Sequence, residues 1–161
     1  GEKHRYGKNT CWERSAHVPL IFAGAGVSAA GTQVDRPVSL VDIYPTLLDL
    51  CGLPAHPNAG RRAPSLDGHT LVPFLNPAGG ETWEGPEAAL SATASSRTVR
   101  SDRYRYILYD NGPGVMEELY DMQNDPWEMH NLAVNPEYNS VKQTLRSQME
   151  TLGARRHVIP E

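Results

Sequence analysis

The sequence predicts an α/β fragment followed by a small α+β unit. A short apolar run at residues 18–23 and a helical pattern at 39–51 are typical of one strand–helix unit. Beyond a loop rich in Pro, Gly and polar residues at 76–87, short alternating runs replace the helical spacing. We therefore divide the 161 residues into a first part, 1–80, and a second part, 81–161.

The composition excludes several classes of protein. With 39% hydrophobic and 21% charged residues, the chain is expected to fold rather than to be disordered. Its formal charge of -4 argues against a nucleic-acid-binding protein, which would carry a basic surface. No apolar stretch reaches ~18 residues, so no membrane span is expected. The start at Gly1-Glu2 shows neither an initiator Met nor a signal-peptide pattern, and we expect a longer gene upstream.

The first part is predicted to hold one strand and one helix. Residues 18–23 are largely apolar and are followed by glycines, which is typical of a strand buried in a parallel sheet. Residues 39–51 carry leucines near helical spacing, with Ser39 as N-cap and Gly52 as C-cap. Pro45 would kink this helix unless it lies in the first turn. A single helical turn is expected near 71–75.

The second part is predicted to be an antiparallel sheet of about four strands with a packed C-terminal helix. The predicted strands are 88–92, 97–101, 104–109 and 116–121. Alternation places Tyr104, Tyr106 and Leu108 on one face of the sheet, and Arg105 and Ile107 on the other.

The predicted C-terminal helix covers residues 136–153. Pro136 opens it, and Val141, Leu145 and Met149 give it an apolar stripe that can pack on a sheet.

The two cysteines and the histidines give no clear catalytic or metal-binding pattern. We favour two buried free thiols, although a Cys11–Cys51 bridge stays open. Cys11 could act as a nucleophile only beside a base that the sequence does not identify, so a structural role is favoured. No histidine pair shows the i, i+4 spacing of a helical metal site, and we predict no metal ligands in this chain.

Two groups of basic residues are candidates for binding an anion. In the first, Lys8 precedes the predicted strand at 18–23, where it could stabilise an anionic oxygen, although a solvated lysine is the simpler interpretation. The second group is made of arginines: Arg97, Arg100, Arg103 and Arg105. Residues 106–141 contain acids but no Lys or Arg, so internal pairing is favoured over a basic face for an acidic substrate.

Several stretches, taken in order, resemble the sulfatases of the alkaline phosphatase superfamily in their C-terminal part. Gly7-Lys8-Asn9-Thr10-Cys11-Trp12-Glu13 resembles the family segment Gly-Lys-x-Thr-x-Trp/Tyr-Glu, and a Val-Pro pair follows it. The other stretches are 39–54, 66–75, 103–107, 118–121 and the run Asp125-Pro126-x-Glu128-x-x-Asn131-Leu132. Together they cover almost the whole chain, and they lean towards the iduronate-2-sulfatase and choline-sulfatase branch.

The resemblance implies a fold and a function. Residues 1–80 would complete an alkaline-phosphatase-like α/β sandwich, and 81–161 would form the C-terminal subdomain at the active-site mouth. Lys8 maps onto the family lysine that contacts the sulfate ester, so it would be catalytic and substrate-binding. His4 would lie near that site, and Arg97 and Arg100 would meet an anionic sugar.

The resemblance also implies parts that this sequence lacks. The family uses formylglycine, made from the cysteine of a Cys-x-Pro-x-Arg motif, and a divalent metal, usually calcium. Neither Cys11 nor Cys51 lies in such a motif, so the nucleophile and metal ligands are expected in the rest of the polypeptide, and this chain alone is expected to be inactive.

The alternatives are a phosphate or phosphonate ester hydrolase of the same superfamily and a non-catalytic binding or scaffold domain. The expected substrate is a sulfated small molecule or sugar, and the expected compartment is extracytoplasmic: periplasmic, secreted or lysosomal. Self-association through the edge of the strand at 18–23 is also expected.

Overall fold

The computed structural model describes residues 3, 9–55, 65–110, 114 and 116–154. Their contacts form two compact units. The described residues up to Pro19 belong with Ala88–Gly153 in the first unit, and those of Leu20–Glu87 form the second. The sequence-based division put residues 1–19 with the second of these groups. That residues 1–80 and 81–161 belong to two domains of an intact enzyme stays a prediction.

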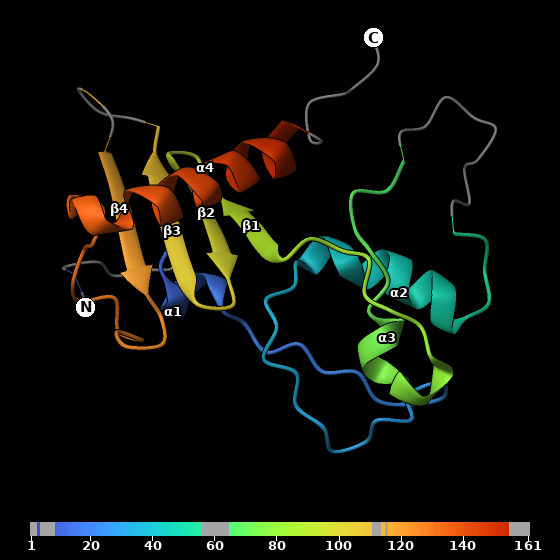
Figure 1. Cartoon of the computed structure of the whole chain (residues 1–161). Helices are drawn as coiled ribbons and strands as arrows, with labels where there is room; N and C mark the ends of the chain where they lie inside the picture. Colours follow the sequence, from blue (N-terminus) through green and yellow to red (C-terminus); the bar gives the residue numbers. More distant parts are fainter. Residues whose placement is uncertain (1–2, 4–8, 56–64, 111–113, 115, 155–161) are drawn as a thin grey trace, which may run out of the picture. The chain divides into compact units, whose positions relative to one another are not determined.

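The first unit is built on a four-stranded antiparallel sheet whose strands follow chain order (Figure 1). Its strands are β1 (Ala88–Ala92), β2 (Ser96–Ser101), β3 (Tyr104–Tyr109) and β4 (Met116–Asp121). The predicted antiparallel sheet is therefore confirmed. Strand β2 starts one residue earlier than predicted because Ser96 still pairs with Tyr109 across the ladder.

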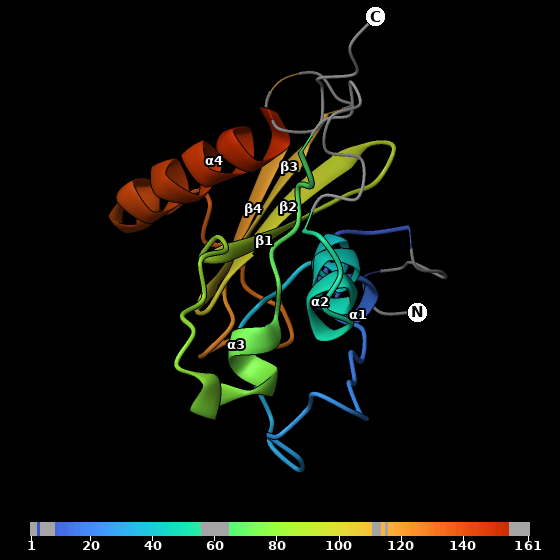
Figure 2. The same ribbon diagram turned by 90° about the vertical axis from the view of Figure 1, so that its right-hand side faces the viewer.

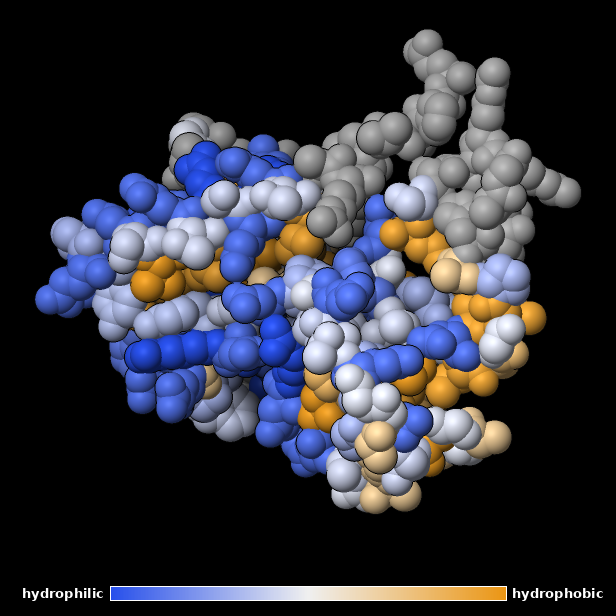
Figure 3. All heavy atoms as spheres, turned by 45° about the vertical axis from the view of Figure 1, so that its right-hand side comes forward, coloured by the Kyte–Doolittle hydropathy of each residue, from blue (hydrophilic) through white to orange (hydrophobic). Residues whose placement is uncertain are grey.

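One face of the sheet is covered by helix α4 (Asn139–Ala154), which confirms the predicted C-terminal helix (Figures 1 and 2). A 3-10 turn, η4 (Pro136–Tyr138), leads into α4, and its N-cap Asn135 accepts a hydrogen bond from the Glu137 amide at 3.1 Å. The buried core between helix and sheet contains Ala88, Leu90, Val99, Tyr106, Leu119, Ala133, Leu145 and Met149. Apolar atoms line this seam between the helix and the strands (Figure 3).

The other face of the sheet is covered by residues 9–17, which include the short helix α1 (Glu13–Ala16). Cys11 is buried there with Ile107, Tyr120 and Met122. The predicted alternation along β3 is confirmed, since Tyr104, Tyr106 and Leu108 pack on the α4 side and Ile107 lies with Cys11. A segment from the start of the chain thus completes the layered packing of the C-terminal sheet.

The second unit contains short helical elements: η2 (Leu40–Asp42), α2 (Ile43–Leu50), α3 (Val72–Leu75) and η3 (Pro77–Gly79). Ser39 and Asp42 form a capping box at the start of η2, as the predicted N-cap requires. Pro45 lies in the first turn of α2, where its missing N–H costs nothing. The helix predicted over 39–51 is therefore formed by η2 and α2 together.

Asp42, at the end of η2, connects the segment before α3 to the start of the η2–α2 helix. Its carboxylate accepts hydrogen bonds from the amides of Ser39, at 2.8 Å, and His69, at 2.9 Å. Gly68 lies against the backbone of Val41, and a Cβ at this position would collide with the Val41 carbonyl group. The Leu66-Asp67-Gly68 stretch is thus explained by a close backbone approach that only glycine allows.

The strand predicted at residues 18–23 is wrong for this chain, because these residues form no ladder. A strand needs a neighbouring strand to pair its backbone N–H and C=O groups. The described residues outside 88–121 contain no strand that could pair with residues 18–23. Ile21 is 85% exposed, which is unlike a strand buried on both faces. The structure therefore gives no basis for self-association through an edge at 18–23. The buried thiol predicted at Cys51 is also wrong, since Cys51 is exposed at the end of α2; both cysteines are free, so no bridge forms.

Apolar side chains reach the surface of the second unit (Figure 3). The exposed large apolar residues around η2 and α2 are Leu40, Val41, Tyr44, Leu47 and Leu53. Among the described residues, no helix is both long and apolar enough to cross a membrane.

Candidate functional site

The segment that follows the Gly7-Lys8 motif is attached to the sheet at two consecutive residues by hydrogen bonds. The Cys11 carbonyl accepts from Arg105 Nη1 at 2.9 Å, and the Cys11 thiol lies 3.2 Å from the Ser96 hydroxyl. The Trp12 indole Nε1 donates to Glu118 Oε2 at 2.8 Å. Burial raises the pKa of the Cys11 thiol, so the thiol stays protonated near neutral pH. This supports a structural role for Cys11 rather than a nucleophilic one.

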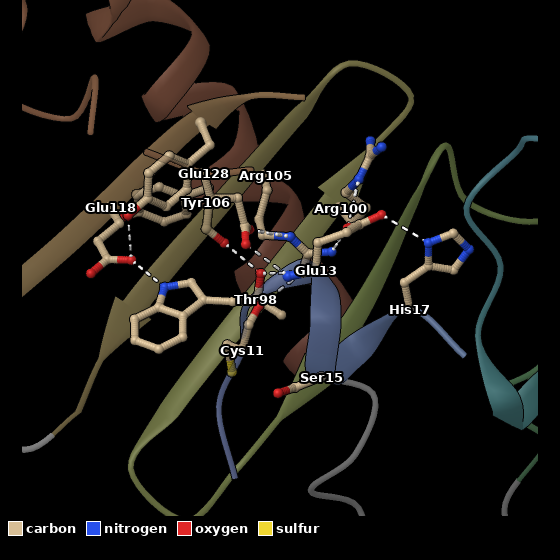
Figure 4. Close-up of polar contacts among 12 residues, drawn as sticks. Cys11, Glu13, Ser15, His17, Thr98, Arg100, Arg105, Tyr106, Glu118 and Glu128 are labelled. Atoms are coloured by element: carbon tan, nitrogen blue, oxygen red, sulfur yellow. Dashed lines mark hydrogen bonds and ion pairs between the residues drawn. The ribbon is translucent and has the colours of Figure 1, made fainter. Parts of the chain in front are cut away.

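The next residue, Glu13, belongs to an ion cluster that we call the clamp, made of the buried Arg105 and Glu128 and the partly buried Glu13 and Arg100 (Figure 4). Arg105 pairs with Glu13 through Nη2 and with Glu128 through Nε, the latter at 3.0 Å. Arg100 Nε lies 3.4 Å from Glu13 Oε2. The Glu13 amide also donates to Glu128 Oε2 at 2.9 Å. Two carboxylates and two guanidinium groups make the clamp electrically neutral.

The strands place both arginines by simple alternation. In β2 and β3, residues 98, 100, 105 and 107 share the face that meets residues 9–17, and Arg105 and Arg100 are direct partners in the ladder. Thr98 Oγ1 accepts from Arg105 Nη1 at 3.2 Å and donates to the Tyr106 carbonyl at 3.0 Å. The Arg105 guanidinium therefore donates hydrogen bonds through both terminal nitrogens, while its Nε faces Glu128 as an ion pair, and its side chain is only 2% exposed.

Glu128 comes from the loop after β4, and that loop is shaped by Asp125. The Asp125 carboxylate accepts from the amides of Met129, at 3.0 Å, and His130, at 2.7 Å. Glu128 takes a left-handed backbone conformation with φ of 56°. A residue with a side chain adopts this conformation at a cost of ~1 kcal/mol or more. Here the conformation delivers the carboxylate to Arg105 and to the Glu13 amide.

Asn131 connects the same loop to the sheet. Its side-chain oxygen accepts from the amides of Leu119, at 3.0 Å, and Ala133, at 2.9 Å, while its Nδ2 donates to the Glu117 carbonyl at 3.2 Å. The run Asp125-Pro126-x-Glu128-x-x-Asn131 is thus a structural motif that joins the sheet, the loop and residues 9–17.

The two clamp carboxyls are shifted in opposite directions. Burial would raise the pKa of Glu13, but the charge and hydrogen bond of Arg105, with Arg100 and His17, lower it overall. Burial raises the pKa of Glu128 more than the hydrogen bond from the Glu13 amide and the charge of Arg105 lower it. Glu13 is therefore the firmly ionised member of the cluster, and Glu128 depends on the Glu13 amide and on Arg105 to stay charged.

A second polar cluster lies around Glu118. Its carboxylate accepts from the Tyr109 hydroxyl at 3.1 Å and the Tyr120 hydroxyl at 2.9 Å, in addition to Trp12. Lys3 Nζ donates to the Tyr120 hydroxyl at 3.1 Å and lies 4.6 Å from the Trp12 ring centroid. Burial, with Glu118 beside it, raises the pKa of Tyr120, so its hydroxyl acts as a donor. Trp12 is therefore held by the hydrogen bond at its Nε1 and by the Lys3 ammonium over its ring.

Of the predicted site residues, Lys8 and His4 lie outside the described residues. Arg97 pairs with Asp110, its Nη2 lying 2.7 Å from Oδ1, and both side chains are 37% exposed. Arg100 is in the clamp. The structure therefore confirms internal pairing for the arginine group: Arg97 with Asp110, Arg100 with Glu13, Arg103 with Asp121, and Arg105 with Glu13 and Glu128.

The Arg103–Asp121 pair gives a titration prediction. The hydrogen bonds from Arg103, at 2.7 and 3.2 Å, lower the pKa of Asp121 from 3.8 to about 2. A lowered carboxyl pKa contributes stability above the unfolded value, and this contribution is lost as pH falls towards 2. Carboxyl NMR titration of Arg103→Gln should therefore show the Asp121 pKa moved upward. Asp125, whose amide contacts do not involve Arg103, should keep its titration, and an unmoved Asp121 would exclude Arg103 as the cause.

The described residues do not fit a calcium or formylglycine centre. They contain no group of three or more His, Cys, Asp or Glu side chains that could hold a metal ion. Neither Cys11-Trp12-Glu13-Arg14 nor Cys51-Gly52-Leu53-Pro54 matches Cys-x-Pro-x-Arg. What this part of the chain supplies is a precisely held segment next to the Gly7-Lys8 motif.

Sequence reasoning did not find the clamp as a unit. It placed Arg105 in an arginine group and Glu13 and Glu128 in two separate family motifs, without joining them. The signal available was the position of Arg105 in β3, on the same face as Ile107, where a charged side chain needs a buried partner.

The fold and the ordered motifs define the C-terminal part of a sulfatase of the alkaline phosphatase superfamily. The sequence model of one family, described as N-sulphoglucosamine sulphohydrolase, C-terminal, matches residues 1–155, and the chain belongs to that family.

Curated relatives include human arylsulfatase K, which is 36% identical. The match covers 91% of this chain and 28% of the relative. A sulfatase of Formosa agariphila is 35% identical over 91% of this chain and 26% of its own length. The chain therefore spans little more than a quarter of the curated relatives it matches.

Solved structures give the same class. A 2-O GAG sulfatase matches with a TM-score of 0.66 and 32% identity, over 84% of this chain and 29% of that one. The phosphonate monoester hydrolase of Agrobacterium radiobacter matches with a TM-score of 0.60 and 31% identity, over 81% and 27%.

Proposed function

We propose that this chain is the C-terminal part of an enzyme that hydrolyses sulfate esters on sugars. The family match over residues 1–155 supports this, as does the similarity to a 2-O GAG sulfatase and to a structure in complex with D-glucosamine-2-N,6-O-disulfate. The formylglycine nucleophile and the calcium ion would be held by the rest of the polypeptide, since the residues described here do not fit them.

Within this chain, we propose Lys8 as the residue that contacts the sulfate ester, with His4 beside it. The observation that carries this is the docking of residues 9–17 on the sheet, since it shows that the segment after Lys8 has a defined place. A lysine ammonium there would stabilise charge that develops on the ester oxygen as the sulfuryl group transfers.

Arg97 and Arg100 remain candidates for contact with an anionic sugar. Arg97 is the better placed of the two, because its ion pair with Asp110 is partly exposed and could exchange for a substrate anion. Arg100 would have to give up Glu13, which is held more firmly by Arg105.

A phosphonate or phosphate ester is the second candidate substrate class, since the Agrobacterium radiobacter hydrolase matches nearly as well as the sulfatase. A non-catalytic binding or scaffold domain is the third. For the sulfatase, we further propose an extracytoplasmic location, as for the family, with the remainder of its own polypeptide as the main partner.

The test is an assay of the full-length protein and of the 161-residue chain with calcium, on a sulfated sugar and on a phosphonate ester. We expect sulfate release by the full-length protein and no turnover by the 161 residues. Preferred hydrolysis of the phosphonate would replace the sulfatase proposal with the second candidate. Activity of the 161 residues alone would refute the assignment of nucleophile and metal to the rest of the polypeptide.

A further inference from the structure

The clamp binds main-chain atoms of residues that follow the proposed catalytic lysine closely in the sequence. Lys8 is three residues before Cys11, so covalent geometry keeps their Cα atoms within about 11 Å of each other. Arg105 binds the Cys11 carbonyl, and Glu128 binds the Glu13 amide. Both contacts hold main-chain atoms, and therefore fix the path of the segment rather than one side chain.

A lysine needs such support more than most catalytic groups. Its ammonium is a point charge on a long flexible stem, so its position depends on where its Cα is held. A misplacement of about 1 Å at a reacting centre can cost ~100-fold in rate. Residues that hold the backbone beside Lys8 can therefore affect the reaction without touching the substrate.

The composition of the clamp is unlike that of a part made only for stability. Arg105 is 2% exposed and Glu128 4% exposed, and a buried ion pair is on average no more stabilising than apolar packing of similar volume. Glu128 also keeps a left-handed backbone with φ of 56°. This arrangement fixes the position of residues 11–13 on the sheet. Ion pairs and amide hydrogen bonds require particular distances and angles, whereas apolar contacts are non-directional.

We propose that Arg105 and Glu128 are positioning residues, which set the place of Lys8 by locking Cys11 and Glu13 against β2 and β3. This inference rests on the proposed role of Lys8. The clamp does not contact the ester; it acts through Glu13 and the main chain of residues 9–13 (Figure 4).

The test is a double-mutant cycle in the full-length enzyme with Glu128→Gln and Lys8→Ala. Glutamine keeps the size of Glu128 and can still accept from the Glu13 amide, but it loses the ion pair with Arg105. We expect Glu128→Gln to lower kcat by about 10-fold to 100-fold with little change in KM. In the Lys8→Ala background the same substitution should have almost no further effect, because the group that it misplaces is gone.

Dependence on the leaving group gives a second readout. Loss or misplacement of a cation near the departing oxygen should make kcat fall more steeply as the leaving group becomes more basic. Glu128→Gln should share this steepening with Lys8→Ala. The control is Lys142→Gln, which removes a 2.6 Å ion pair to Glu117 on the α4 face of the same sheet. It should leave both kcat and the dependence of kcat on leaving-group basicity unchanged.

Equal effects of Glu128→Gln in both backgrounds, or no effect on kcat, would overturn the inference while leaving the role of Lys8 intact. No effect of Lys8→Ala would overturn that role first, and the inference with it. If Glu128→Gln does not fold, the same cycle is run with Arg105→Lys, which keeps a positive charge but cannot bind the Cys11 carbonyl, Glu13 and Glu128 together. Additivity there is equally decisive against the inference.

Discussion

Replacing Arg105 by methionine is expected to destabilise the sheet unit by about 3–5 kcal/mol, the range for breaking a buried ion pair by removing one partner. Glu13 and Glu128 would both lose their main counter-charge, and the Cys11 carbonyl would lose its donor. Methionine keeps most of the side-chain volume, so the loss reports the charge and the hydrogen bonds. Urea unfolding of the 161-residue chain measures it.

The loss should also depend on pH. In the variant, Glu128 keeps the hydrogen bond from the Glu13 amide but loses the charge of Arg105, so its pKa rises further and it can become neutral by taking up a proton. A raised carboxyl pKa favours the folded state at low pH and penalises it as pH rises through that value. The destabilisation should therefore be smaller near pH 5 than near pH 8.

Two controls separate this effect from a general loss of packing. Lys142→Gln breaks a partly buried pair on the α4 face and should cost much less, since both of its partners are about 20% exposed. Arg105→Lys should recover only part of the loss, because an ammonium cannot reach Cys11, Glu13 and Glu128 together. A loss below 1 kcal/mol that is independent of pH would contradict a charged clamp.

The second large effect is expected for Lys8→Ala in the full-length enzyme. Removing one group that stabilises developing negative charge typically costs ~10²–10³ in rate. We expect a fall of this order in kcat with little change in stability, measured by steady-state kinetics and thermal unfolding on the same samples. A variant that unfolds several degrees lower but turns over normally would show that Lys8 has a structural role.

Lysine at position 3 provides a matched comparison. Lys3 donates to Tyr120 and lies over the Trp12 ring, so its partners are side chains of the sheet and the docked segment. Lys3→Ala should therefore change stability modestly and leave the leaving-group dependence of kcat as it is. A loss of rate as large as that of Lys8→Ala would mean that the assignment of Lys8 from its motif is not specific.

Local patterns in the sequence were sufficient to predict the C-terminal sheet. Short strands with alternating side chains joined by tight turns form from nearby residues, so alternation in Tyr104, Tyr106 and Leu108 was enough to predict both faces of β3. The amphipathic stripe of α4 is likewise local. These elements need no information about distant parts of the chain.

The elements that were missed depend on distant partners. A strand at 18–23 needs neighbours that the described residues do not supply, whatever its own apolar content. The clamp joins Glu13 to Arg105 and Glu128, which are 92 and 115 positions away. Such contacts follow from how segments dock, and a single sequence holds no periodic signal for them.

The clamp docks residues 9–17 on the sheet, and the reactivity of the Cys11 thiol measures this docking most directly. Cys11 is 4% exposed, so in a Cys51→Ser chain, where it is the one remaining thiol, it should react with a disulfide reagent only slowly under native conditions. Reaction should become fast when Arg105→Met is added. Fast labelling without that substitution would contradict the docked segment and the clamp with it.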